Sequence, residues 1–158
     1  MIWGMTTATF TLVHVVLSLI GIGAGLIVMF GLLSGKLPPG WNTLFLVTTV
    51  ATNVTGFGFP FDHLLPSHKV GIISLVALAV AIVAHHGLRL AGAWRRVYVI
   101  TAAIALYLNV FVAVTQAFLK IPALTALAPT QAEVPFAIVQ LVVLALFIAF
   151  TVVATKRA

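Results

Sequence analysis

The sequence predicts an all-α membrane protein, a polytopic bundle of five transmembrane helices that forms one domain over residues 1–158. Three observations lead to this fold class. Hydrophobic residues make up 63% of the chain and charged residues only 6%, far from the composition of a soluble domain. The apolar residues form long unbroken runs, whereas a transmembrane barrel needs many alternating strands of about ten residues. The mean hydropathy of +1.26 is typical of a chain surrounded by lipid.

Five segments approach or exceed the roughly 20 residues that cross the hydrocarbon core of a bilayer. The first is Thr7–Leu33. No cation precedes it and its apolar run is too long for a cleaved signal, so we expect it to remain as a helix. Residues 41–59 form the second segment, which is the shortest and most polar. The third, fourth and fifth segments cover 70–90, 97–119 and 135–155.

Lysine and arginine residues set the predicted orientation, because cytoplasmic loops carry an excess of them. With the loop "RLAGAWRR" in the cytoplasm, six cations lie on that side, namely Lys36, Arg89, Arg95, Arg96, Lys156 and Arg157. Only Lys69 and Lys120 lie on the other side. The bias predicts an N-terminus outside and a cytoplasmic C-terminus. The two outer connections carry five of the seven prolines, which indicates stiff caps.

Composition also limits the class of partner and of chemistry. The net charge is +6, but the cations lie at segment ends and not on one basic face, so no nucleic-acid partner is expected. The chain has no cysteine, which excludes disulfides and cysteine-ligated clusters. The expected partners are the lipid bilayer and either further copies of this chain or a larger membrane complex.

Polar side chains recur at one depth in four of the five segments. In the first segment, His14 and Ser18 follow Thr11 at steps of three and four, so the three residues share a helical face. Polar residues at a depth of roughly 5–10 Å below the predicted outer ends are His14, Asn53, Gln116 and Gln140. Intramembrane polar groups are costly, so their convergence in the outer third of the bundle indicates a functional site.

The connection "TGFGFPFDHLLPSHK" places further polar groups above this layer. His68 begins the third segment, and adjacent packing would bring it opposite His14. Neutral imidazoles bind haem iron and other transition metals, so His14 and His68 are candidate ligands of a metal or of one b-type haem. Asn53, Gln116 and Gln140 would surround the cofactor. Asp62 and His63 would relay protons at the outer mouth.

Two other interpretations use the same segments. Quinone carbonyls need a histidine or amide donor near the interface, beside aromatic walls, and His14, Gln116 and Gln140 with Phe57, Phe59 and Phe61 could provide them. A non-catalytic subunit of a larger complex fits the long apolar faces and the lack of a strong motif. His85 and His86, beside Arg89, indicate a positive belt at the inner interface, and no partner histidine supports a second haem there.

A pore-loop ion channel is a further alternative. The stretch "TTVATNVTGFGFP" has the threonines and the Gly-aromatic-Gly step of a carbonyl-lined filter, and the second segment is short enough to re-enter the membrane. Pro60 departs from that pattern, and re-entry would place Lys36 outside, which weakens the charge bias to five against three.

The stretches "TGFGFPFDHLLPSH", "GAWRRVYV", "ALYLNVFV" and "LAPTQAEVPF" resemble a group of small multi-span proteins of the bacterial inner membrane. The resemblance covers most of the chain. It implies a multi-pass protein of the bacterial inner (plasma) membrane and carries no activity and no site residue.

Overall fold

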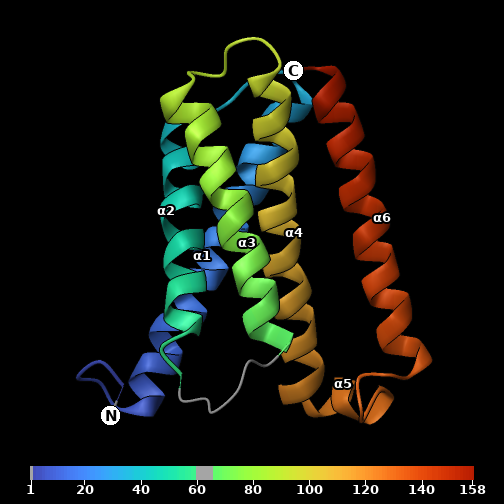
Figure 1. Cartoon of the computed structure of the whole chain (residues 1–158). Helices are drawn as coiled ribbons and strands as arrows, with labels where there is room; N and C mark the ends of the chain where they lie inside the picture. Colours follow the sequence, from blue (N-terminus) through green and yellow to red (C-terminus); the bar gives the residue numbers. More distant parts are fainter. Residues whose placement is uncertain (1, 60–65) are drawn as a thin grey trace.

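The structure is a computed structural model that describes residues 2–59 and 66–158. The described part is all-α, and its long helices run side by side along one axis, with the two termini at opposite ends (Figure 1). The elements are α1 (Thr7–Leu33), α2 (Pro39–Gly56), α3 (Pro66–Ile82), the π-helical turn η1 (Val83–Gly87), α4 (Trp94–Lys120), α5 (Pro122–Leu127) and α6 (Val134–Lys156).

Four helices of the described part are long and apolar enough to cross a membrane, and they confirm a multi-span helical membrane protein. They are α1, α3 with η1, α4 and α6. α2 occupies the place of the second predicted segment, but its 18 residues include two asparagines and five threonines and it is not among these four. A fifth crossing therefore stays a prediction.

The ends of α1 are set by local hydrogen bonds. Thr6 is the N-cap, and its hydroxyl accepts from the backbone N–H of Thr9 at 3.2 Å. At the other end, the N–H of Lys36 donates to Gly31 O at 2.8 Å and the N–H of Gly35 donates to Leu32 O at 3.0 Å. This is a Schellman motif, and it requires the left-handed φ of +74° that Gly35 adopts. The motif turns the chain sharply into α2.

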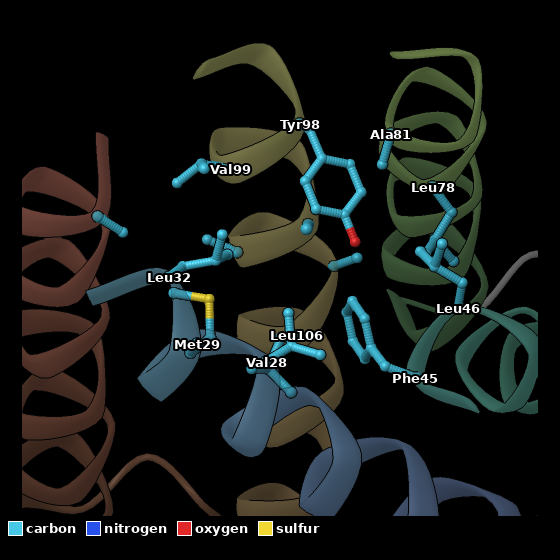
Figure 2. Close-up of a cluster of buried hydrophobic side chains, with 14 of the residues drawn as sticks. Val28, Met29, Leu32, Phe45, Leu46, Leu78, Ala81, Tyr98, Val99 and Leu106 are labelled. Carbon is cyan, nitrogen blue, oxygen red and sulfur yellow. The ribbon is translucent and has the colours of Figure 1, made fainter. Parts of the chain in front are cut away.

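A hydrophobic core joins α1, α2, α3 and α4 in the half of the bundle nearer the C-terminus. Figure 2 shows its side chains meeting between the helices. Phe45 of α2 and Leu106 of α4 are 1% and 0% exposed, and both lie against Gly25 of α1. Nearer the end of the bundle, the buried hydroxyl of Tyr98 donates to Oδ1 of Asn42. The half of the bundle nearer the C-terminus is thus filled by apolar side chains and one buried polar pair.

α6 lies at the edge of this four-helix group (Figure 1). It packs mainly along α4, and only 11% of its most apolar window is buried. The remaining surface is apolar, as expected for a helix that faces lipid.

Candidate functional site

The half of the bundle nearer the N-terminus, at the end opposite to the hydrophobic core, contains a cavity of about 100 Å³ between α1, α2, α3 and α4. Three residues that the sequence predicted for one site, His14, Asn53 and His68, line this cavity. Ser18 and Asn109 line it as well and were not among the predicted site residues. Their signal in the sequence is the shared face, because Ser18 follows His14 by one helical turn.

His14 is held in one orientation by α2. Its Nδ1 lies 2.7 Å from Oγ1 of Thr55. Oγ1 of Thr55 also lies 2.8 Å from Ala51 O and 3.0 Å from Thr52 O. We assign its single hydrogen to these backbone carbonyls, so that the Thr55 oxygen accepts from His14 and Nδ1 carries the hydrogen. In the neutral ring the lone pair then lies on Nε2.

Hydrogen bonds also set the orientation of the Asn53 side chain. Its Nδ2 donates to Thr49 O at 2.8 Å and to Oγ of Ser74 on α3 at 3.2 Å. Both hydrogens of the amide group are engaged, so Oδ1 remains as an acceptor. The bond to Ser74 also ties α2 to α3 at the level of the cavity.

Ser18 and Asn109 tie α1 to α4. The hydroxyl of Ser18 donates to Oδ1 of Asn109 at 2.9 Å. Nδ2 of Asn109 is buried and has no hydrogen-bond partner among the described residues. Because an unpaired buried donor is destabilising, this amide is a place where a ligand or a water would gain a hydrogen bond.

Aromatic rings border the histidines. The ring of His68, which is 6% exposed, lies 5.2 Å from the ring of Phe57. The ring of Phe59 lies 5.4 Å from that of His14 and 4.9 Å from that of Phe10. Phe10 is fully buried, so this row of rings covers one flank of the site.

The other predicted site residues lie elsewhere. Gln116 is exposed and does not line the cavity. Gln140 is buried, but its Nε2 donates to Phe111 O at 3.2 Å and to Oγ1 of Thr115 at 3.3 Å, and so ties α6 to α4. The proposed proton-relay residues, Asp62 and His63, lie outside the described residues.

The size of the cavity limits what it can hold. A volume of about 100 Å³ is the scale of a few waters, and it is smaller than the apolar cavity of roughly 150 Å³ that holds benzene. Pockets that enclose a whole drug-sized ligand measure roughly 300–1,000 Å³. A complete haem does not fit between these side chains as they stand. No group of three His, Asp or Glu residues that could hold a metal ion occurs in the described ranges.

The residues of the proposed ion filter adopt a helical ending. Thr55 and Gly56 belong to α2, and the N–H groups of Phe57 and Gly58 donate to Val54 O and Thr55 O at 3.1 and 2.9 Å. A filter needs carbonyl groups that are free to replace the hydration shell of an ion. In this conformation the carbonyl of Thr55 is already engaged, and the channel alternative stays a prediction.

No protein-family model, curated protein or solved structure matches this chain. The features described above therefore identify it as a multi-span helical membrane protein, and its resemblance to a bacterial inner-membrane group stays a prediction.

Proposed function

We propose that this protein spans the bacterial inner membrane five times and binds the head group of a lipid-soluble quinone in the cavity of its outer half. One observation carries the proposal. Histidines from two helices, His14 and His68, and the amide of Asn53 from a third line one cavity of about 100 Å³. Histidine, amide and aromatic groups gathered inside an apolar bundle suit a flat ligand with polar oxygens at its edge.

The fit of the cavity favours the quinone over the haem. Both ligands would use the two histidines, but a haem needs space for a whole macrocycle between them. A quinone needs space only for one ring, and its tail can remain in lipid. The cavity of about 100 Å³ is closer to this second requirement.

The residues take distinct parts in this proposal. Nε2 of His14 accepts a hydrogen bond from a hydroxyl of the reduced ring, because Nδ1 is engaged with Thr55. Oδ1 of Asn53 is a second acceptor, and the ring of Phe57 forms a wall beside His68. Asp62 and His63 remain the proposed route for protons at the outer mouth.

The test begins with the protein purified in detergent. Organic extraction followed by chromatography with mass detection should recover quinone from the wild-type chain, and little from the variants His14→Ala and His68→Ala. The matched controls are His85→Ala and His86→Ala, because neither residue lines the cavity. Size-exclusion profiles and circular dichroism show whether each variant stays folded.

An absorption spectrum recorded before and after dithionite separates the alternatives. A Soret band that shifts on reduction would show that the protein binds a b-type haem, and the quinone proposal would be given up. Equal quinone content in folded wild-type, His14→Ala and His68→Ala protein would contradict the proposed site.

A further inference from the structure

Hydrogen bonds inside the bundle decide which polar atoms of the cavity remain for a ligand. Thr52 and Ser18, like Thr55, have one hydroxyl hydrogen each, and both hydrogens are engaged internally. Oγ1 of Thr52 donates to Thr48 O at 2.7 Å, and Oγ of Ser18 donates to Asn109 at 2.9 Å. Their oxygens keep lone pairs and have no hydrogen left to offer.

Among the cavity atoms whose hydrogen bonds are described here, which leaves the ring of His68 out of the count, acceptors outnumber donors. These acceptors are Nε2 of His14, Oδ1 of Asn53, Oγ of Ser18 and Oγ1 of Thr52. Against these four, Nδ2 of Asn109 is the donor without a partner among the described residues. A ligand that brings hydrogens satisfies such a wall, and a ligand that brings only acceptors leaves it unpaired.

We infer that the cavity binds the reduced, hydroquinone form of a quinone in preference to the oxidised form; this inference rests on the proposed function. A hydroquinone has two hydroxyl hydrogens and can donate to His14 and Asn53. The oxidised ring has carbonyl oxygens only. These oxygens can accept a hydrogen bond from Asn109, but they form none with the four acceptors.

The preference for the hydroquinone depends on the hydrogen bond between Thr55 and His14, although Thr55 itself does not contact the ligand. Thr55 accepts the hydrogen of His14 Nδ1 and so holds the Nε2 lone pair in place. Without the Thr55 hydroxyl, the imidazole of His14 can carry its hydrogen on Nε2 and donate to a carbonyl. Thr55 is therefore a positioning residue for the choice between the two redox states.

The experiment compares duroquinone with its hydroquinone, titrated anaerobically into the full-length protein in detergent after removal of bound quinone. Binding is followed by tryptophan fluorescence or calorimetry. We expect the hydroquinone to bind on the order of tenfold more tightly, which corresponds to about 1.4 kcal/mol. The variant Thr55→Val should lower the ratio of the two affinities, because it weakens the binding of the hydroquinone more than the binding of the quinone.

A matched control is Thr43→Val, because the Thr43 hydroxyl also donates to its own helix, at 3.1 Å from Pro39 O, at an exposed position. This variant should keep the wild-type ratio. If Thr55→Val does not fold, the wild-type ratio alone decides the inference. Equal affinities, or tighter binding of the quinone, would overturn the inference and leave the proposed function standing. Binding of neither ring would overturn both.

Discussion

Gly25 marks the closest approach of α1 to the hydrophobic core. A Cβ atom at this position would lie 2.6 Å from Cδ1 of Leu106 and 2.9 Å from Cδ1 of Phe45. Both neighbours are buried side chains of the core. Gly23, on the same helix, has nothing within 4 Å of its Cβ position. The two glycines therefore differ in their packing and share their helical setting.

We expect Gly25→Ala to lower the free energy of unfolding by about 1–3 kcal/mol, because a buried methyl group would overpack the core. Gly23→Ala should leave stability unchanged or raise it by about 0.5–1 kcal/mol, since alanine favours a helix. Unfolding in a detergent-to-SDS titration, followed by tryptophan fluorescence, measures both. Equal effects of the two substitutions would show that α1 does not approach the core as described.

Glu133 lies in the outer link just before α6 and gathers several hydrogen bonds. Oγ1 of Thr130 donates to its carboxylate at 2.6 Å, and the N–H groups of Thr130 and Ala132 donate at 3.1–3.2 Å. These bonds, first of all that from the Thr130 hydroxyl, lower the pKa of the Glu133 carboxyl below its ordinary value. The ionised carboxylate thus holds the link together at neutral pH.

Because the folded-state pKa of Glu133 is depressed, its stabilising effect is present above the ordinary value near 4.3 and is lost as the pH falls through the folded-state pKa. Glu133 is the only glutamate in the sequence, so a sample labelled with ¹³C-glutamate gives one carboxyl signal to titrate. We expect a midpoint below the ordinary glutamate value in the wild type and a higher midpoint in Thr130→Val. The same midpoint in both proteins would contradict this account.

The site residues show what periodicity can and cannot predict for single side chains. Depth and shared faces correctly grouped His14 with Asn53. They did not show which side of α4 each polar residue of a neighbouring helix would contact. Thr115, which binds Gln140, follows Asn109 by six residues, about 240° around the helix, so Gln140 lies on the other side of α4 from the cavity. Such a rotation depends on the packing of neighbours, which one sequence does not contain.

At the scale of elements, the link between α1 and α2 depends on one backbone conformation. Gly35 has a φ of +74°, which an L-residue with a side chain adopts at a penalty of roughly 1–2 kcal/mol. The carbonyl of Gly35 also accepts from the guanidinium of Arg95 at 2.9 Å, which fastens the link to the start of α4. A change at this glycine therefore acts on three helices.

Gly35→Ala should lower the free energy of unfolding by roughly 1–2 kcal/mol. Gly40→Ala is the matched control, because Gly40 lies in the first turn of α2 and has nothing within 4 Å of its Cβ position. We expect no loss of stability in that variant. Differential scanning fluorimetry in one detergent can rank the three proteins, and a Gly35→Ala protein as stable as the Gly40→Ala protein would disprove the role of the Schellman motif.

Element boundaries were predictable to different degrees. The first segment matches α1 at both ends, Thr7 and Leu33, because threonines precede it and a Ser-Gly pair follows it. α5 was not predicted, since its six residues between prolines are too few to show a helical period. The π turn at Val83–Gly87 also gave no sequence signal, because it differs from an α-helix only in its hydrogen-bond register.

At the scale of the whole molecule, composition and long apolar runs predicted a helical membrane protein, and the structure confirms that class. The loops that carry the six predicted cytoplasmic cations lie at the same end of the bundle as the C-terminus (Figure 1). The number of crossings did not follow from the sequence, because α2 is long enough to cross but rich in polar residues. Its orientation in a bilayer needs a direct measurement.

The absence of cysteine makes that measurement simple, since single cysteines can be introduced without background. We expect a membrane-impermeant maleimide to label Ala132→Cys in intact spheroplasts, and Lys36→Cys and Arg157→Cys only after permeabilisation. External labelling at Lys36 with protection at Arg157 would show that α2 re-enters the membrane. External labelling at both, with protection at Ala132, would reverse the predicted orientation.

The packing around Phe45 and Leu106 has a consequence for the side of the membrane with which the cavity can exchange protons. These side chains, 1% and 0% exposed, lie between the polar cavity and the buried pair of Tyr98 and Asn42. Within the described part of the chain, these two apolar side chains separate the cavity from the polar pair. We expect a proton released by a ligand in the cavity to return to the compartment at the N-terminal end, so the protein would exchange protons with one side of the membrane and would not carry them across.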